Sequence, residues 1–140
     1  MPLQWLVLVA AVLVIYFPTI NYQLTQYDDA FFTESSAKWL KQSGNISDAF
    51  TQGVFSDPAS KSDSYYRPML LLTFYFDEWI GGSSLKAFHI TNIIIHLLNV
   101  LLVLLLFRKL KFSSPVSFWM AMFFAIHPAL QQAVSWIPGR

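Results

Sequence analysis

Two adjacent carboxylates, Asp28 and Asp29, follow the first apolar segment of the chain. Carboxylates this close to a membrane-type segment are costly to remove from water, so their presence needs a reason. A carboxylate held near a hydroxyl group can act as a general base, and paired carboxylate oxygens also suit a divalent cation. Asp is also a favoured residue at the start of a helix. We expect one base and one helix cap or metal ligand, with a preference for Asp28 as the base.

A second set of polar residues recurs at spacings of three, four and three within an apolar segment: His89, Asn92, His96 and Asn99. At about 100° per residue these four fall within one sector of a helix. Lipid cannot satisfy polar side chains, so the stripe should face other helices or a wet cavity. Hydrogen bonds between helices would explain Asn92, His96 and Asn99. His89, nearer the outer end, could instead bind a phosphate or orient a carboxylate.

Two arginines are candidates for binding an anion. Arg67 follows Tyr66 and precedes Pro68, where a helix is expected to start and an anion would be favoured. A guanidinium can hold a phosphate through two parallel hydrogen bonds. The alternative is an arginine lying at a membrane interface beside aromatic anchors. Arg140 could meet a phosphate in the same way. The three histidines form no recognised metal motif, so no histidine metal site is predicted.

The composition is that of a membrane protein. Of 140 residues, 55% are hydrophobic and only 12% are charged, whereas about a quarter of a soluble domain is charged. The chain has no cysteine, which excludes disulfides and thiolate metal sites. A formal net charge of +1 gives no reason to expect nucleic acid as a partner. Membrane lipids are the expected surroundings.

The apolar residues cluster into three segments. They predict an all-α, multi-pass membrane protein with three transmembrane helices and a large outer loop that carries short interfacial helices. The predicted order is a transmembrane helix at about 3–20, an outer loop at 21–86, a transmembrane helix at 87–107, a cytoplasmic turn at 108–112, a transmembrane helix at about 113–127 and an outer interfacial helix at 128–138. The first segment has no basic leader and no clear cleavage site, which favours an uncleaved span over a signal peptide.

Within the outer loop, an amphipathic helix is predicted over 30–42, an irregular stretch over 45–64 and a helix over 68–80. The basic cluster Arg108, Lys109 and Lys111 sets the orientation, because positively charged turns stay in the cytoplasm. The outer loop is then periplasmic or luminal, and the N-terminus is cytoplasmic. A bundle of three spans would bury little, so we interpret the chain as the N-terminal part of a larger polytopic protein.

These motifs follow one another in an order that resembles a known family. They are Tyr27-Asp28-Asp29, Ser64-Tyr65-Tyr66-Arg67-Pro68-Met69, Leu72-Thr73-Phe74, Phe88-His89-Ile90-Thr91-Asn92, His96-Leu97-Leu98-Asn99, His127-Pro128, Ala133-Val134-Ser135-Trp136-Ile137 and Gly139-Arg140. Over nearly its whole length the chain resembles the N-terminal region of the transmembrane and tetratricopeptide-repeat O-mannosyltransferases and their bacterial relatives. These are C-type glycosyltransferases that depend on polyprenyl phosphate.

The resemblance implies an enzyme with its active site on the outer face. Its donor would be a sugar, hexosyl or mannosyl, on dolichyl or undecaprenyl phosphate, and its acceptor a hydroxyl of a protein or glycan, with inversion at the sugar. Asp28 or Asp29 would be the base that activates the acceptor. Arg67, His89 and Arg140 would stabilise the leaving lipid phosphate. The substrate-binding residues implied are Arg67, His89, Tyr66 and Arg140.

The resemblance also implies further spans and tetratricopeptide repeats beyond this sequence, so a fragment ending at Arg140 is expected to be inactive alone. Two other functions fit the residues. A polytopic transporter or flippase would use the stripe of His and Asn residues to line a path. A non-enzymatic membrane assembly subunit would use the outer loop as a docking surface. The cofactor requirement is left open, with a divalent cation as the one candidate.

Overall fold

The structure, a computed structural model, describes residues 2–24, 46–51, 53, 66–82 and 84–140. Within these residues every regular element is a helix and no strand occurs, which confirms the predicted all-α class. The chain divides into two compact units. One consists of Met1–Gln23 and His89–Arg140, and the other of Leu24–Phe88.

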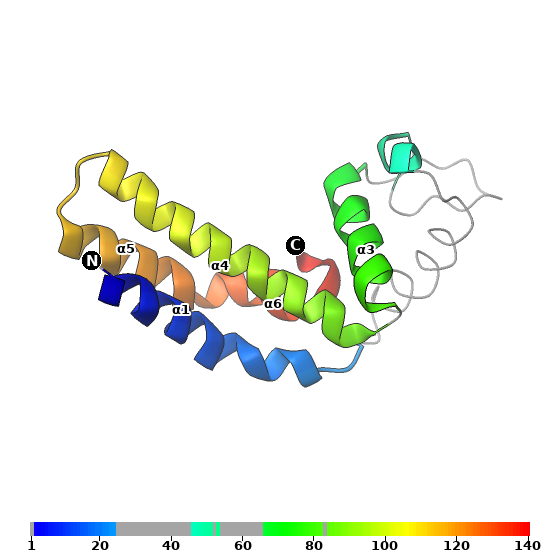
Figure 1. Cartoon of the computed structure of the whole chain (residues 1–140), viewed down its shortest axis with the longest axis horizontal. Coiled ribbons are helices and arrows are strands. Elements are labelled where there is room, and N and C mark those ends of the chain that lie inside the picture. The colour runs from blue at the N-terminus through cyan, green and yellow to red at the C-terminus, as the bar shows by residue number, and fades with distance from the viewer. Residues whose placement is uncertain (1, 25–45, 52, 54–65, 83) are drawn as a thin grey trace. The chain divides into compact units, whose positions relative to one another are not determined.

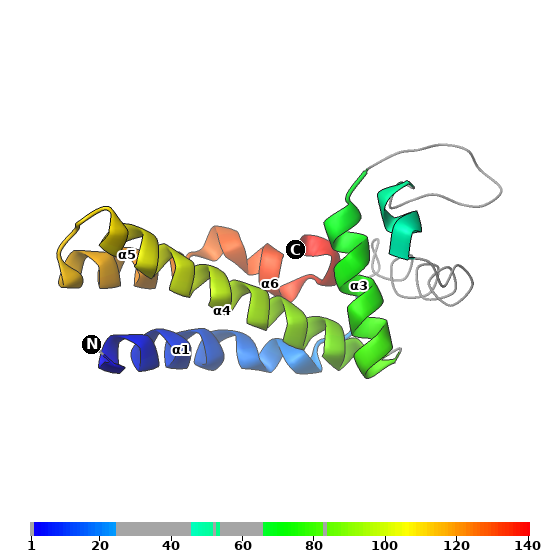
Figure 2. The same ribbon diagram turned by 45° about the horizontal axis from the view of Figure 1, so that its top comes forward.

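The first unit is built from apolar helices that lie side by side (Figure 1, Figure 2). It contains α1 (Pro2–Tyr16), η1 (Phe17–Asn21), most of α4 (Leu85–Lys109) and α5 (Ser114–Ile126). Ala121 and Ala125 are one turn apart on α5 and are fully buried. Their small side chains let α5 approach its neighbours closely. The shared core includes Leu8, Val12, Tyr16, Ile93, Val100, Leu104, Ala121, Ala125 and Val134.

Two helical segments are long and apolar enough to cross a membrane, Leu3–Asn21 and Leu85–Lys109. The second has 25 residues and is about 37 Å long at ~1.5 Å per residue. The helix predicted at about 113–127 is present, but its prediction as a third transmembrane span is wrong because it is too short. Here α5 has 13 residues and is about 20 Å long, whereas a hydrocarbon core is about 30 Å thick. It ends because Pro128 disfavours the helical conformation at His127, which is extended.

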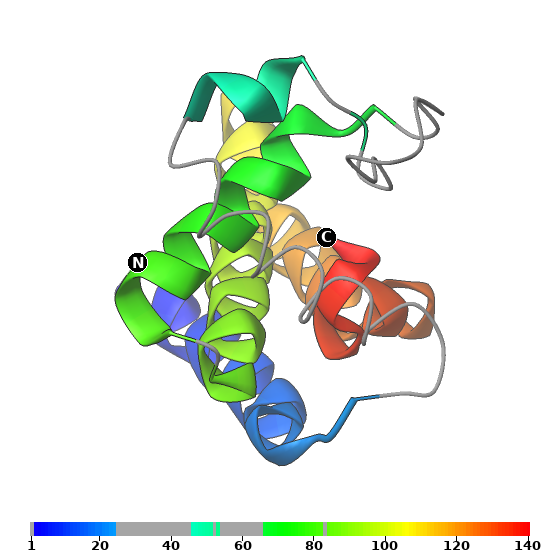
Figure 3. The same cartoon turned by 90° about the vertical axis from the view of Figure 1, so that its right-hand side faces the viewer.

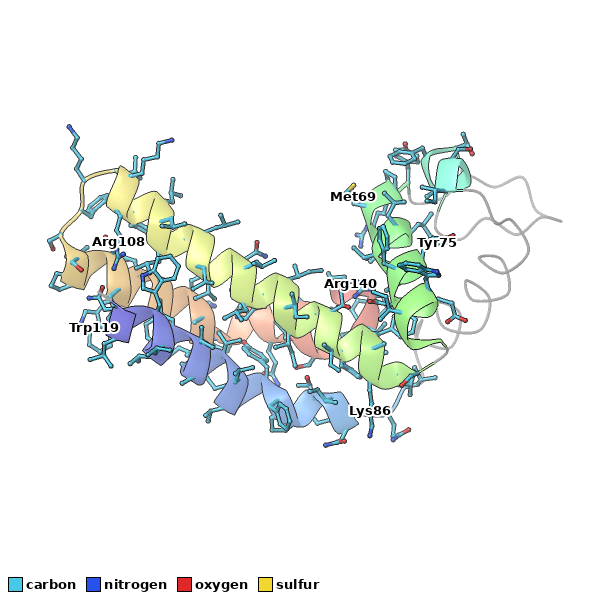
Figure 4. The ribbon with its side chains drawn as sticks, in the orientation of Figure 1. Met69, Tyr75, Lys86, Arg108, Trp119 and Arg140 are labelled. Atoms are coloured by element: carbon cyan, nitrogen blue, oxygen red, sulfur yellow. The ribbon has the colours of Figure 1, made fainter. Side chains whose placement is uncertain are left out.

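The side-chain amide of Gln4 joins the end of α4 to the starts of α1 and α5 through hydrogen bonds. The guanidinium of Arg108 donates to Gln4 Oε1 at 2.6 Å, and Ser114 Oγ donates to the same oxygen at 3.0 Å. Arg108 also lies 5.7 Å from the centre of the Trp5 ring and is labelled in Figure 4. Lys111 then adopts a positive φ of 63° in the short connection to α5. The predicted turn at 108–112 therefore begins inside α4.

The second unit contains η3 (Ile46–Phe50), α3 (Pro68–Gly81) and the first turn of α4. The helix predicted over 68–80 is present as α3, with Pro68 in its first turn and Gly82 at φ 59° after its end. Phe74 meets Phe88 edge to face, with ring centres 5.5 Å apart. The stretch expected to be irregular over 45–64 includes the short helix η3 among its described residues.

Candidate functional site

The predicted base cannot be placed. Asp28 and Asp29 lie outside the described residues, as does the helix predicted over 30–42. Their assignment as general base, helix cap or metal ligand therefore stays a prediction. Among the residues that the structure describes, no group of three or more His, Cys, Asp or Glu side chains could hold a metal ion.

The polar stripe of α4 faces inward at three of its four positions. His89, Asn92 and His96 have exposed fractions of 2%, 1% and 5%. Asn99 is exposed to solvent, so its predicted inward orientation is wrong. At about 100° per residue, Asn99 lies at the edge of the sector that the stripe defines. The fully buried Val100 takes the inward position at that level.

The amide of Asn92 joins α4 to the C-terminal segment. Its Nδ2 donates to the backbone oxygens of Val134 and Trp136, at 3.2 and 3.1 Å. Its Oδ1 accepts from Nη1 of Arg140 at 3.1 Å. Both amide N–H donors and the amide oxygen are thus engaged. The partners fix the orientation of the amide, because carbonyl oxygens need a donor and a guanidinium needs an acceptor.

The C-terminal segment reaches Asn92 because it is broken into short pieces beside α4 (Figure 3). A single interfacial helix over 128–138 was predicted, and this is wrong. The chain instead forms η4 (Pro128–Leu130), α6 (Gln131–Ser135) and η5 (Ile137–Gly139). Trp136 is extended between α6 and η5, which interrupts the helix and lets the chain change direction.

Because Gly139 has no side chain, it can lie close to the backbone of α6 at the last turn of the C-terminal segment. A Cβ atom at Gly139 would collide with the backbone oxygen of Gln132, so a residue with a side chain cannot take this position without a shift. The N–H of Gly139 donates to the backbone oxygen of Trp136 at 3.0 Å. Val134 and Ile137 are each 1% exposed and anchor the segment. Arg140 is thereby delivered to the surface of α4 (Figure 4).

The two buried histidines of the stripe have different surroundings. His96 Nε2 is hydrogen-bonded to the backbone oxygen of Ala125 on α5 at 3.0 Å, and its ring packs between Tyr16 and Phe124. This is the interhelical role that the sequence allowed for it. His89 meets the ring of Tyr22 edge to face, with ring centres 6.4 Å apart.

Tyr66 and Arg67 belong to the second unit, whereas His89 and Arg140 belong to the first. Tyr66 is exposed and its hydroxyl donates to the backbone oxygen of Phe50 at 3.0 Å. Arg67 directly precedes α3, and its carbonyl oxygen accepts from the N–H of Leu71 at 3.2 Å. Of the predicted site residues that the structure describes, Arg140 donates to the side chain of Asn92.

The link between Asn92 and Arg140 was not predicted. These residues are 48 positions apart, and no local pattern pairs an asparagine on one helix with a distant arginine. Gln4 was missed in the same way, because its partner Arg108 is 104 positions away. The only available signal was that Gln4 is a polar residue inside an apolar segment, which asks for a partner.

Comparison with known proteins gives several partial relatives. The chain is 34% identical over 94 residues to human Protein O-mannosyl-transferase TMTC1, covering 66% of this chain and 10% of that protein. It is 30% identical over 135 residues to human Protein O-mannosyl-transferase TMTC4, covering 81% and 18%. It is 32% identical over 81 residues to Protein O-mannosyl-transferase Tmtc1 of Drosophila melanogaster, covering 58% and 9%.

The resemblance to the O-mannosyltransferases is confirmed. The chain spans between 9% and 18% of the length of these three relatives. No protein-family model matches the chain, and no solved structure matches it significantly.

Proposed function

We propose that this chain is part of a membrane glycosyltransferase that moves a mannosyl group from a polyprenyl-phosphate-linked donor to a hydroxyl group of a protein. The observation that carries the proposal is its similarity to several proteins named protein O-mannosyl-transferase. Two helices long and apolar enough to cross a membrane support a lipid-linked donor, because such a donor resides in the bilayer.

In the proposed reaction, Asp28 or Asp29 takes the proton of the acceptor hydroxyl as its oxygen attacks the anomeric carbon of the sugar. The bond from that carbon to the phosphate oxygen breaks, and its electron pair leaves with the lipid phosphate. Attack from the face opposite the leaving group inverts the configuration of the sugar. A general base of this kind contributes about 10²–10⁴-fold to the rate.

Arg140, with Arg67 and His89, is proposed to stabilise the phosphate as it leaves. The guanidinium of Arg140 donates to the amide oxygen of Asn92 at 3.1 Å. Two unit charges about 4 Å apart attract by about 4 kcal/mol near a protein surface. A fixed cation at the leaving group therefore lowers the barrier without having to reorganise during the reaction.

We further propose the topology that the reaction requires. The basic residues Arg108, Lys109 and Lys111 lie on the cytoplasmic side, and the Asp pair on the periplasmic or luminal side. The short helix α5 re-enters the membrane beside α1, and η4 and α6 complete the return to the outer side. The interaction of α5 with α1 in the shared core supports this arrangement.

The transporter alternative would need the polar stripe to line an open path. Asn92 and His96 are instead hydrogen-bonded to backbone carbonyls of the C-terminal segment and of α5. These contacts favour a structural role for the two side chains, so we do not adopt that function.

The decisive experiment exchanges each carboxylate in the full-length protein. Asp28→Asn, Asp29→Asn and the double variant are expressed, and mannosyl transfer to a protein acceptor is measured with Asp63→Asn as the control from the same loop. One single variant and the double variant should lose at least 100-fold in rate, while the control keeps its activity. Undiminished transfer by all three variants would refute the base, and with it the proposed mechanism.

A further inference from the structure

The connection between α4 and α5 carries the basic cluster Arg108, Lys109 and Lys111. The two lysine side chains are exposed and Arg108 is half-buried. The compact unit that contains this cluster, Met1–Gln23 with His89–Arg140, has no Asp or Glu residue in its sequence. No acidic side chain of this unit can therefore neutralise the cluster.

Arg108 keeps its positive charge inside the bundle. It donates to Gln4 Oε1 at 2.6 Å and lies 5.7 Å from the centre of the Trp5 ring. Both of these partners are uncharged. The Nε of Arg108 is buried and has no hydrogen-bond partner among the described residues. Because Lys109 and Lys111 are close to it in the chain, the charge of Arg108 adds to the positive potential around them.

Lys111 occupies a backbone position that usually belongs to glycine. Its N–H donates to the backbone oxygen of Arg108 at 3.0 Å, and the N–H of Phe112 donates to that of Phe107 at 3.1 Å. Together with the φ of 63° at Lys111, these bonds form the Schellman motif that ends α4. A lysine is less favourable than glycine at such a φ. Its presence there suggests that the side chain contributes something that glycine would not.

Apolar and aromatic side chains surround the basic cluster. Leu110 and Phe112 alternate with the lysines and are 59% and 49% exposed. Trp119 on α5 is also exposed and lies at the same end of the first unit as Arg108 (Figure 4). Exposed aromatic residues beside lysines are typical of the level of a membrane where the lipid headgroups lie.

We propose that the basic cluster binds the phosphate groups of anionic membrane lipids, with Lys109 and Lys111 as the contacting residues. This inference rests on the proposed function for its topology, which puts the cluster at the cytoplasmic surface. All eight acidic residues of the chain lie within positions 28–78, on the other side of the membrane in that topology. The lipid headgroups are then the source of the missing negative charge. The helix dipole favours cations at the end of α4, but Lys111 lies beyond that end.

The test titrates phosphatidylglycerol into the full-length protein in a zwitterionic detergent, and native mass spectrometry gives the apparent Kd. Phosphatidylcholine reports binding of a lipid without net charge, and glycerol phosphate reports whether a free phosphate competes. The variants are Lys109→Gln, Lys111→Gly and the double variant, and Lys111→Arg retains the charge. Lys86→Gln is the matched control, because Lys86 is exposed near the start of the same helix (Figure 4).

Each single variant should raise the Kd for phosphatidylglycerol about fivefold and the double variant about 25-fold, since a lysine near an anionic surface contributes about 1 kcal/mol. Lys111→Arg and Lys86→Gln should change the Kd by less than about twofold. Lys111→Gly should unfold at the temperature of the wild type or above it, because glycine fits the positive φ. A loss of lipid binding in this variant then cannot come from a damaged turn. If it does not fold, Lys111→Asn replaces it, because asparagine also tolerates this conformation.

Unchanged phosphatidylglycerol binding by the double variant would overturn the inference, as would an equal loss from Lys86→Gln. Equal affinity for phosphatidylcholine would overturn it too, and competition by glycerol phosphate would assign the cluster to a free phosphate instead. Mannosyl transfer is assayed separately in the wild type. Selective lipid binding without transfer would refute the proposed activity and leave the inference, whereas transfer without selective lipid binding would do the reverse.

Discussion

Gln4 should contribute measurably to stability, because its side-chain oxygen joins three helices. It accepts from Arg108 at 2.6 Å and from Ser114 at 3.0 Å. A hydrogen bond to a charged group contributes about 1.5–3 kcal/mol, and one between neutral groups about 0.5–1.5 kcal/mol. All three side chains are half-buried, so water replaces part of the lost interaction. We therefore expect Gln4→Leu to reduce the free energy of unfolding by about 2 kcal/mol.

The measurement is the thermal unfolding of the full-length protein in detergent, followed by the loss of the monodisperse species with temperature. Gln4→Leu keeps the size of the side chain and removes only its hydrogen-bonding groups. Gln131→Ala is the control, because Gln131 is exposed on α6. A midpoint for Gln4→Leu equal to those of the control and the wild type would refute the reasoning, since it would mean that Gln4 does not hold the three helix ends together.

Three further outcomes are expected. Gly139→Ala should lower mannosyl transfer, because its Cβ would collide with the backbone oxygen of Gln132 and displace the C-terminal segment. Gly82→Ala, at a positive φ with open space around it, is the comparison for a glycine effect without that collision. Ala121→Leu should destabilise the protein by about 1–3 kcal/mol by overpacking the fully buried contact of α5, as read from the unfolding midpoint; an unchanged midpoint would contradict the close packing. Treatment with EDTA should abolish transfer if the Asp28–Asp29 pair binds a divalent cation. Full activity after exhaustive chelation would leave these two aspartates only the roles of general base and helix cap.

The helices that could be predicted are those with strong local signals. Pro68 and the Gly81-Gly82 pair mark the two ends of α3, and a long, mainly apolar run with a basic end marks α4. Each signal lies within the element that it describes, so tertiary contacts did not need to be known.

The errors of prediction arise where packing or proline decides the outcome. A third transmembrane span was predicted, but α5 has only 13 residues because Pro128 ends it at Ile126. Asn99 was predicted to face inward because its spacing fits the stripe, but the buried residue at that level is Val100.

The candidate site could be predicted as a set of residue types, and only partly as a geometry. The residue type of Arg140 makes it a candidate for binding an anion, and the spacing of the stripe predicts that Asn92 faces inward. Their hydrogen bond does not, because it joins residues 48 positions apart. The roles in the reaction of all the predicted site residues stay predictions: Asp28, Asp29, Tyr66, Arg67, His89 and Arg140.

The hydrogen bonds of the buried side chains of Asn92 and His96 have a consequence for the synthesis of the chain. The partner of His96 is 29 residues further along the chain, and the last partner of Asn92 is 48 residues further. At a synthesis rate of about 5–20 residues per second, these partners are made roughly 1.5 to 10 seconds after His96 and Asn92 themselves. During that interval these two polar side chains, on a helix long and apolar enough to cross a membrane, have none of these partners, and lipid cannot replace them. If α4 crosses a membrane as proposed, the insertion machinery would have to shelter it until α5 and the C-terminal segment arrive.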